Sequence, residues 1–319
     1  MGIALALLAA LLVIGTPASG AGSTRIYVTN YLDNTASVID GGANAVVATV
    51  RVGRAPAGMA VSPDGRFVYI ANSAGNSVSV LDSTSNRIAW TIALPRRSRP
   101  VGLAVSPDGR DLYTADGGSN RVSVIDTRTR RRVASVRVGR QPLSIALSPD
   151  GAMLYSANSG SGTLSVINAR TRRLTRTIPT GRFPSGVAVT PDGASVYVTN
   201  ELSGVTIVSA VSGKVEARLA TPSPFGVAMS PDGARAYVTD LGPGKLTAID
   251  TRARQVSSAV SVGPTGTDPF TVQATGDAIY VTNQGANTLS VIDPNTLQAA
   301  ATVPTGNSPY GVAVVHSAG

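Results

Sequence analysis

Short apolar runs of four or five residues alternate with turns along nearly the whole chain. One unit of this pattern has four runs rich in Val, Ile, Thr and Tyr, at residues 186–190, 196–199, 205–208 and 215–219. Gly, Pro, Asn and Asp gather in the segments between such runs. Past the N-terminal segment, no stretch keeps the three- and four-residue apolar spacing of a helix over ten positions. The pattern therefore predicts an all-β protein built from short strands.

The unit repeats with a fixed period. Ser-Pro-Asp-Gly or Thr-Pro-Asp-Gly begins at residues 62, 106, 148, 190 and 230, a degenerate Thr-Gly-Asp begins at residue 275, and a tyrosine follows each of them. Together with one more near the N-terminus, these tyrosines are 42, 44, 42, 42, 40 and 43 residues apart: Tyr27, Tyr69, Tyr113, Tyr155, Tyr197, Tyr237 and Tyr280. A period of this length indicates repeated supersecondary units, and four antiparallel strands per unit are typical of a propeller blade. We predict a seven-bladed β-propeller of four-stranded antiparallel blades.

The two ends of the chain predict how the ring closes. The first unit lacks its first strand and begins with a second strand at residues 26–29, whereas the chain finishes with a lone first strand at residues 311–315. The C-terminal strand is therefore expected to complete blade 1, a 3+1 closure that removes the open sheet edges of an unclosed array. We predict a single propeller domain over residues 22–319.

Each first strand follows a proline and carries a small residue two positions after it. These small residues are Gly58, Gly102, Ser144, Gly186, Gly226, Thr271 and Gly311. Because seven inner strands converge on one axis, we expect small side chains where the strands crowd together.

The N-terminal segment has a different pattern. Residues 3–14 form an apolar run of twelve, and small residues follow at positions 18–21. This is typical of a secretory signal peptide over residues 1–21, although the charged residues that usually precede the apolar run are missing, and a weak N-terminal anchor is the alternative. The sequence thus predicts a secreted, periplasmic or cell-surface protein with no membrane span in the mature chain.

Tyr-Val-Thr-Asn occurs at residues 27–30, 197–200 and 280–283, and Tyr-Val-Thr-Asp occurs at residues 237–240. On these motifs, residues 25–315 resemble the YVTN-repeat family of β-propellers. The resemblance implies a secreted or surface protein of bacteria or archaea, and many members of the family have no assigned activity. The family is also similar to seven-bladed lactonases and to quinoprotein dehydrogenase propellers. The resemblance therefore implies an architecture and leaves the reaction open.

The composition excludes several kinds of active site. There is no cysteine, and the single histidine is His316, close to the C-terminus. A Ser-His-Asp or Cys-His centre therefore has no suitable base, and haem d1 or copper sites lack the histidines they need. Trp90, the one tryptophan, lies in a predicted fourth strand, where we expect a packing role. We expect no cofactor, apart from Ca²⁺ in the lactonase alternative described below.

Function is expected where the repeats differ from one another. Arginines stand one or two residues before the prolines that open the first strands of blades 2 to 5: Arg54, Arg99, Arg140 and Arg182. Aromatic residues stand beside the opening prolines of blades 5, 6, 7 and 1: Phe183, Phe225, Phe270 and Tyr310. In propellers these segments surround the channel on one face. An arginine arc opposite an aromatic arc predicts a site for an anionic ligand with a flat or sugar-like body. The alternative is that the aromatic residues pack between blades and the arginines face solvent.

A second candidate site consists of carboxylates on the same face. The second strand of every blade ends in Asn or Asp, and we interpret this repeated position as a turn cap: Asn30, Asn72, Asp116, Asn158, Asn200, Asp240 and Asn283. The carboxylates expected on this face are Asp116, Glu201, Asp240 and Asp268. They could hold Ca²⁺ in a lactonase-like hydrolase, although their loops belong to four different blades.

Positive charge is concentrated in one part of the chain. The formal net charge is +9, and residues 96–182 alone hold sixteen arginines against five aspartates. Seven of these arginines lie in or beside predicted turns between third and fourth strands: Arg128, Arg130, Arg131, Arg132, Arg170, Arg172 and Arg173. Such a patch predicts salt-dependent binding of a polyanion, either a cell-wall polymer or nucleic acid without sequence readout. A solvated basic surface is the alternative.

The interpretation that these patterns favour is a monomeric, non-enzymatic scaffold that binds an anionic small molecule, a cell-surface polymer or a protein. The first alternative is a lactonase-like hydrolase. The second is a polyanion-binding protein that uses blades 3 and 4.

Overall fold

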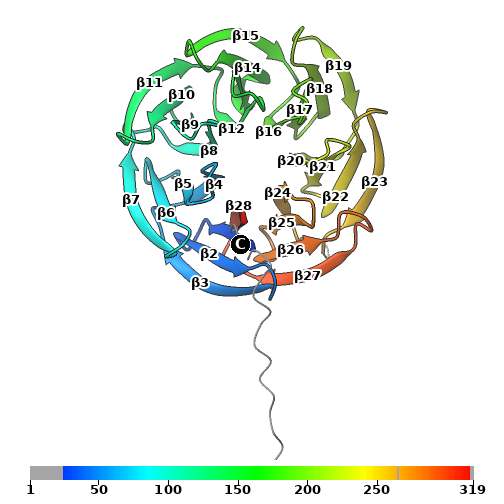
Figure 1. Ribbon diagram of the computed structural model, residues 1–319. Coiled ribbons are helices and arrows are strands. Elements are labelled where there is room, and N and C mark those ends of the chain that lie inside the picture. The colour runs from blue at the N-terminus through cyan, green and yellow to red at the C-terminus, as the bar shows by residue number, and fades with distance from the viewer. Residues whose placement is uncertain (1–23, 264–265, 317–319) are drawn as a thin grey trace, which may run out of the picture.

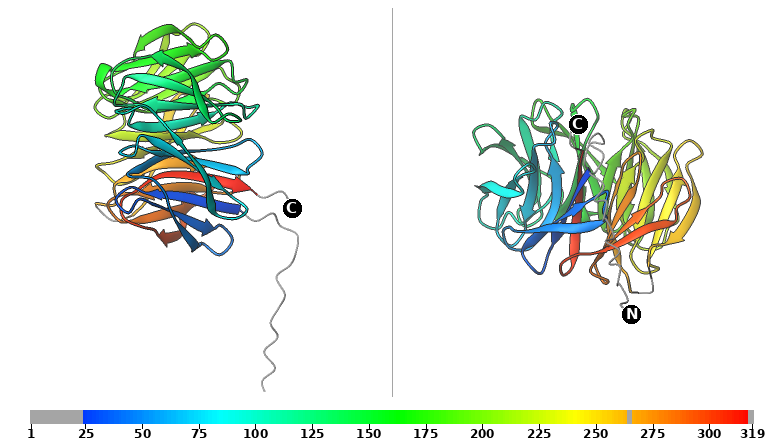
Figure 2. Two further views of the ribbon diagram at one scale, coloured as in Figure 1. Left: turned by 90° about the vertical axis from the view of Figure 1, so that its left-hand side faces the viewer. Right: turned by 60° about the horizontal axis from the view of Figure 1, so that its bottom comes forward.

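The computed structural model describes residues 24–263 and 266–316, and its strands form seven four-stranded antiparallel sheets around a central axis (Figure 1). The side views in Figure 2 show that the sheets stand as blades of one disc. This arrangement confirms the predicted seven-bladed β-propeller. The predicted signal peptide at residues 1–21 lies outside the described residues.

Each blade runs from an inner strand at the axis to an outer strand at the rim. Blade 1 consists of β28 (Pro309–His316), β1 (Thr24–Asn30), β2 (Thr35–Asp40) and β3 (Ala45–Arg51). Blade 2 consists of β4 (Pro56–Val61), β5 (Phe67–Asn72), β6 (Ser77–Asp82) and β7 (Arg87–Ala93). Blade 3 consists of β8 (Pro100–Val105), β9 (Asp111–Asp116), β10 (Arg121–Asp126) and β11 (Arg131–Arg137).

Blade 4 consists of β12 (Pro142–Leu147), β13 (Met153–Asn158), β14 (Thr163–Asn168) and β15 (Arg173–Pro179), with a short 3-10 turn, η1 (Ser159–Ser161), after β13. Blade 5 consists of β16 (Pro184–Val189), β17 (Ser195–Asn200), β18 (Gly204–Ser209) and β19 (Val215–Leu219). Blade 6 consists of β20 (Pro224–Met229), β21 (Arg235–Asp240), β22 (Lys245–Asp250) and β23 (Gln255–Ser261). Blade 7 consists of β24 (Pro269–Ala274), β25 (Ile279–Asn283), β26 (Thr288–Ile292) and β27 (Ala299–Pro304).

The hydrophobic core lies between neighbouring blades. The second and third strands are almost fully buried because both of their faces pack against adjacent sheets, whereas the outer strands alternate or face solvent. The repeated tyrosine belongs to this core: Tyr155 of blade 4, for example, packs in one cluster with Val187 and Val196 of blade 5. Val, Ile and Tyr fit such a pleated, two-sided environment, which explains why they dominate these strands.

The ring closes by the predicted 3+1 arrangement. β28 pairs antiparallel with β1, with Tyr27 opposite Ala313 and Thr24 opposite His316. The first and last described strands therefore share one sheet, and blade 1 has four strands like the other six blades.

The small residues of the inner strands are explained by backbone contacts between blades. A Cβ atom on Gly58 would lie 2.5 Å from the carbonyl oxygen of Val101 in the next inner strand, and one on Gly311 would lie 2.6 Å from that of Ala57. The crowding predicted at the axis is thus a close approach of each inner strand to the backbone of its neighbour.

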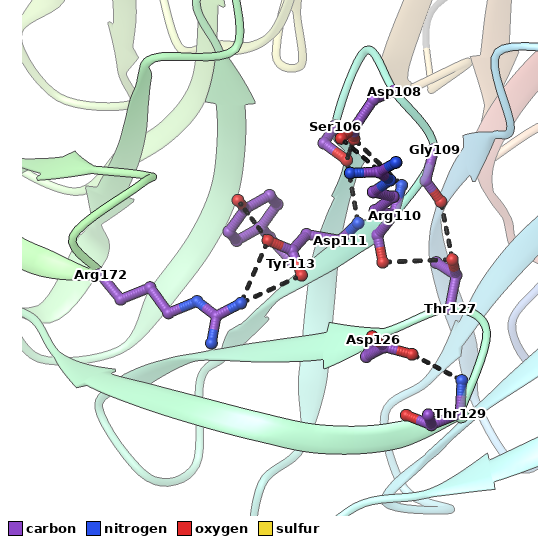
Figure 3. Close-up of polar contacts among 10 residues, drawn as sticks. All are labelled: Ser106, Asp108, Gly109, Arg110, Asp111, Tyr113, Asp126, Thr127, Thr129 and Arg172. Atoms are coloured by element: carbon purple, nitrogen blue, oxygen red, sulfur yellow. Dashed lines mark hydrogen bonds and ion pairs between the residues drawn. The ribbon is translucent and has the colours of Figure 1, made fainter.

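The connections divide between two faces. We call the face that carries the loops between second and third strands and between blades the top face, and the face that carries the Pro-Asp-Gly turns the bottom face. A typical bottom turn is held by Ser106, whose hydroxyl donates to Asp108 over 2.6 Å and accepts from the N–H of Asp111 over 2.9 Å (Figure 3). Gly109 adopts a φ of 72° there, a conformation that glycine permits without strain.

Candidate functional site

A turn that precedes the opening proline of every blade sets the positions of the residues on the top face. The residue before each opening proline has a φ between 46° and 56° in all seven blades: Ala55, Arg99, Gln141, Phe183, Ser223, Asp268 and Ser308. In four of them an asparagine of the preceding blade holds the backbone N–H, as in the bond of 2.8 Å from Ala55 to Asn34. The chain then enters the inner strand with the residue after the proline at the channel mouth.

These residues after the opening prolines make the channel mouth asymmetric. They are small or aliphatic in blades 2 to 5 and aromatic in blades 6, 7 and 1: Ala57, Val101, Leu143, Ser185, Phe225, Phe270 and Tyr310. The ring centres of Phe225 and Phe270 are 3.9 Å apart, and those of Phe270 and Tyr310 are 4.5 Å apart. Tyr31 extends the series, with its ring stacked 5.9 Å from Tyr310. We call these four residues, Phe225, Phe270, Tyr310 and Tyr31, the aromatic wall.

A cavity of about 240 Å³ lies between the aromatic wall and the small residues of blades 2 to 4. Its apolar lining includes Ala57, Val101, Leu143, Tyr31 and Tyr310. Its polar lining comes from one cation and several uncharged groups: Arg99, Gln141, Gln284 and Ser73. We call this space the mouth cavity. An apolar pocket with few polar groups is the usual form of a small-molecule site.

Tyr310 separates the mouth cavity from the axial channel, since it lines both spaces. The channel itself is a narrow space of about 180 Å³ between the inner strands. Burial raises the pKa of the Tyr310 phenol, and the nearby Tyr31 and Glu201 raise it further. Burial also raises the pKa of Glu201, in the loop that follows β17. Glu201 itself does not line the mouth cavity.

The structure brings only part of the predicted arginine and aromatic arcs together. Arg99 and Tyr310 line the mouth cavity, and Phe225 and Phe270 continue the wall beside Tyr310. Arg182 and Phe183 instead line a separate hollow between blades 4 and 5, where 44% of Phe183 is exposed.

The other two arginines lie on the exposed rim. Arg54 donates from Nη2 to the carbonyl oxygen of Ala74 over 3.2 Å, and Arg140 is exposed. Sequence reasoning missed three residues of the cavity, namely Tyr31, Gln141 and Gln284. Tyr31 and Gln284 directly follow a strand-ending asparagine. A comparison of that position across the repeats, where blades 2, 3 and 4 have serine or glycine, is the signal that could have found them.

The four candidate calcium ligands do not converge. Asp116 and Asp240 are 1% exposed and are bonded inside their own blades. Asp116 accepts from the hydroxyls of Thr114 and Ser123 over 2.7 and 2.6 Å, and Asp240 accepts from Thr247 over 2.5 Å. Among residues 24–263 and 266–316 no three His, Asp or Glu side chains gather as metal ligands do. Glu201 and Asp268 thus remain on separate loops of blades 5 and 7, and the donor set does not fit Ca²⁺.

The two buried aspartates occur where the preceding loop has proline instead of glycine. In the five blades with asparagine, the loop before the opening proline has a glycine at one fixed place: Gly53, Gly139, Gly181, Gly263 and Gly306. The N–H of Gly53 donates to Asn72 over 3.0 Å, and that of Gly306 donates to Asn30 over 3.1 Å. Pro95 and Pro222 hold the corresponding place before Asp116 and Asp240, and proline has no N–H to donate.

Burial dominates the titration of both carboxyl groups. Burial raises the pKa of Asp116 to about 6, against the opposing effect of the Ser123 and Thr114 hydroxyls. It likewise raises the pKa of Asp240 to about 6, against the effect of Thr247. The strand-ending positions are therefore buried structural groups of the blade interior.

The seven arginines of the predicted polyanion patch lie on the bottom turns and outer strands of blades 3 and 4, and two of them have partners. The guanidinium of Arg130 lies 3.9 Å from the ring centre of Trp90. Arg172 reaches across to Asp111, with Nη2 and Oδ1 3.4 Å apart (Figure 3). The others are exposed and form no ion pair with a described residue: Arg128, Arg131, Arg132, Arg170 and Arg173.

No helix in the described part of the chain is long and apolar enough to cross a membrane. His316, the single histidine, lies at the far end of β28 from the mouth and is 3.2 Å from the hydroxyl of Thr24. The mouth cavity therefore contains no imidazole.

Solved structures with this fold differ widely in sequence from the chain. A chain of hydrazine synthase from Kuenenia stuttgartiensis aligns with a TM-score of 0.74 and 22% identity, over 82% of this chain and 96% of its own length. A functionally unknown protein from Desulfotomaculum acetoxidans aligns with a TM-score of 0.76 and 13% identity, over 92% and 99% of the two chains. The dihydro-haem d1 dehydrogenase NirN, in complex with DHE, aligns with a TM-score of 0.69 and 17% identity, over 91% and 74%.

These likenesses, all below 25% identity, show the propeller fold alone. A comparison with curated protein sequences gives no match. A family model is more informative, because it covers most of the repeats. Residues 45–318 match the model of the virginiamycin B lyase family, and the chain therefore belongs to that family.

Proposed function

We propose that this protein is a rigid binding scaffold and that the mouth cavity holds a compact ligand with a flat or ring-shaped body and an anionic or carbonyl group. One observation carries the proposal: Arg99 of blade 3 and the stacked Tyr310 and Tyr31 of blade 1 line the same cavity. The tyrosine rings offer apolar faces for a flat body, and the guanidinium offers paired donors to a carboxylate. Gln141 and Gln284 add donors and acceptors that fix the orientation of such a ligand.

The family's name refers to a lyase, and a lyase that works by elimination must remove a proton from its substrate. Among the residues that line the mouth cavity, the group with a proton to exchange is the phenol of Tyr310, whose pKa is raised by burial. A phenol that holds its proton so firmly serves better as a hydrogen-bond donor than as a base. Binding is therefore our proposal, in preference to elimination or to metal-dependent lactone hydrolysis.

Titration with 2-naphthoate tests the proposed site, because this probe has one flat apolar body and one carboxylate. We expect saturable binding by the wild-type protein in isothermal titration calorimetry. The variants Arg99→Gln and Tyr310→Ala should each bind roughly tenfold or more weakly, since a hydrogen bond to a charged group contributes about 1.5–3 kcal/mol. Arg54→Gln is the matched control, because Arg54 carries the same charge on the same rim outside the cavity. Equal affinity in the Arg99 and Arg54 variants would contradict the proposal, and release of a product from the probe would replace it by an enzymatic function.

The exposed arginines of blades 3 and 4 support a second function, which is the binding of a linear polyanion. The acids of the nearby turns are occupied within those turns, as Asp126 is by the N–H of Thr129 (Figure 3). The five unpaired guanidinium groups are therefore free to contact phosphate or sulfate groups along an extended chain.

Binding of long-chain polyphosphate should depend on these arginines and on salt. The triple variant Arg131→Gln, Arg132→Gln, Arg173→Gln is expected to lower the slope of log K against log salt concentration by roughly 2, since each lost phosphate contact removes about 0.7–0.9. Removal of three top-face arginines, in Arg54→Gln, Arg96→Gln, Arg97→Gln, changes the net charge equally and should leave the slope nearly unchanged. An equal effect of both triple variants would show attraction by net charge alone and would exclude a localised surface.

A further inference from the structure

The threonine of the Tyr-Val-Thr-Asn motif bridges neighbouring blades at the height of the channel mouth. In blade 6 the hydroxyl of Thr239 accepts from the N–H of Gly226 over 2.8 Å and donates to the carbonyl oxygen of Phe270, in blade 7, over 2.8 Å. Thr282 makes the same pair of bonds, to the N–H of Thr271 over 3.0 Å and to the Tyr310 carbonyl over 3.0 Å. Each hydroxyl thus fixes its own inner strand and the next one together.

With one exception, the bridge is present only where the residue after the opening proline of the next blade is aromatic. Thr199 donates to the carbonyl of Phe225 over 2.5 Å, so all three aromatic residues that follow opening prolines are held in this way. The exception is Thr29, which donates over 2.7 Å to the carbonyl of Ala57.

In blades 2, 3 and 4 the motif position is Ala71, Ala115 and Ala157. Among the described residues, the carbonyls that follow these alanines around the ring receive no hydroxyl from a neighbouring blade: Val101, Leu143 and Ser185. The inner strands on the hollow side of the mouth are therefore not tied together by such bonds.

We propose that Thr199, Thr239 and Thr282 are positioning residues that hold the aromatic wall in place. Their hydroxyl bonds join neighbouring inner strands on the aromatic side of the mouth, whereas the described residues of the opposite side have no such bonds. The consequence of these hydrogen bonds for ligand binding rests on the proposed function. The hydrogen bonds themselves are present in the protein without a ligand. Thr239 is the decisive member, because the carbonyls of Phe225 and Tyr310 each accept a second hydroxyl, from Ser185 and Thr271 respectively. Among the hydroxyls of the described residues, that of Thr239 alone bonds to the Phe270 carbonyl, and Phe270 stands between the other two rings.

Fluorine NMR on protein labelled with 4-fluorophenylalanine tests this without a ligand. The chain has four phenylalanines, two of which (Phe225 and Phe270) belong to the wall, whereas the other two (Phe67 and Phe183) lie elsewhere and serve as internal references. In Thr239→Val we expect the resonances of Phe225 and Phe270 to shift and broaden, because their ring stacking of 3.9 Å is disturbed, while the two reference resonances stay in place. Thr239→Ser keeps the hydroxyl and should restore the wild-type positions.

Thr29→Val is the matched control. It removes a hydroxyl with the same two bonds, from the N–H of Gly311 and to the carbonyl of Ala57, so its loss of stability should be similar. Because Ala57 has no ring to displace and Gly311 lies next to Tyr310, the Phe225 resonance should remain unchanged and that of Phe270 should move less than in Thr239→Val. Equal perturbation by Thr29→Val and Thr239→Val would overturn the inference, as would four unmoved resonances in Thr239→Val.

The affinity for 2-naphthoate separates this inference from the proposed function. We expect Thr239→Val to weaken binding of the probe by roughly fivefold, the loss of about one neutral hydrogen bond. Thr251→Val, which removes a bottom-face hydroxyl bonded to the carbonyl of Gly233 over 2.6 Å, should leave the affinity unchanged. Resonance shifts without any binding of naphthoate to the wild type would support the positioning role and reject the proposed ligand class. Binding that is equally strong in Thr239→Val, with unmoved resonances, would reject the positioning role alone.

Discussion

A chain truncated after residue 308 should no longer unfold cooperatively, and a peptide of residues 309–316 added in trans should restore the transition. β28 is both the inner strand of blade 1 and the contact between β1 and the strands β4 and β24 of the neighbouring blades. It buries Val312 and Val315, which are 9% and 5% exposed. Burial of two such side chains contributes roughly 3–6 kcal/mol, a large part of the about 5–15 kcal/mol that stabilises a typical domain.

Circular dichroism during thermal unfolding measures this effect. The control is a chain that ends at His316, which keeps all of β28 and should melt as the full chain does. The peptide should rescue the truncated chain at concentrations that saturate, and a peptide with Val312→Pro should not, because proline cannot donate to β1 and disrupts the pairing of Val28 with Val312. A truncated chain that melts cooperatively at the wild-type temperature would contradict the role assigned to ring closure.

Replacement of Asp116 by asparagine is expected to stabilise the protein at neutral pH, and Asp240→Asn should do the same to a smaller degree. The folded-state pKa of each carboxyl group is raised to about 6, above its value in the unfolded chain. The native state therefore binds the proton more tightly, and the stability that this contributes is fully present below about pH 4 and lost as the pH rises to 6. Above pH 6 both carboxylates are charged and buried, which asparagine avoids.

The size of the effect follows from the shift. Two pKa units correspond to an upper bound of about 2.7 kcal/mol per site, and we expect about 1–2.5 kcal/mol for Asp116→Asn at pH 7. Urea unfolding at pH 4, 5.5 and 7 measures the difference, which should shrink towards zero or reverse at pH 4. Asp192→Asn is the contrasting control, because the Thr190 hydroxyl and the Ala194 N–H lower the pKa of Asp192 in its bottom turn, so this variant should lose stability at neutral pH. A pH-independent gain in Asp116→Asn would show that the carboxyl group is not the source.

The period of the tyrosines was sufficient to predict the number of blades, the apolar runs predicted their four strands, and the two ends of the repeat array predicted the closure by β28. This succeeded because each repeat carries its own strands and turns, so local sequence determines local structure. The strand-ending asparagines show the limit of that logic. Their repetition suggested a turn cap, whereas Asn30 reaches into its blade and donates to the hydroxyls of Thr35 and Ser37 over 2.9 and 3.0 Å.

The candidate site was predictable only in part, since it is assembled from residues that are neighbours around the ring and distant along the chain. Arg99 and Tyr310 lie on blades 3 and 1, and their meeting depends on small side chains such as Val101 and Gly117 in between. Phe183 directly precedes its opening proline as Arg99 does, but it lines another hollow together with Arg182. A motif repeated around a ring specifies the height of a residue on its blade, while the sizes of its neighbours decide whether it reaches the centre.

Ring closure through β28 has a topological consequence. The break between His316 and Thr24 falls where the other six blades have a bottom turn between their first and second strands, so the two residues end up side by side, with Thr24 Oγ1 3.2 Å from His316 Nδ1. A short peptide with the Ser-Pro-Asp-Gly turn could join them, and the circular chain could then be opened at any of the six turns that join first and second strands in the other blades. Every such permutant would have its ends on the bottom face. Whichever blade carries the tether, the mouth of the channel would point away from the surface to which the protein is attached.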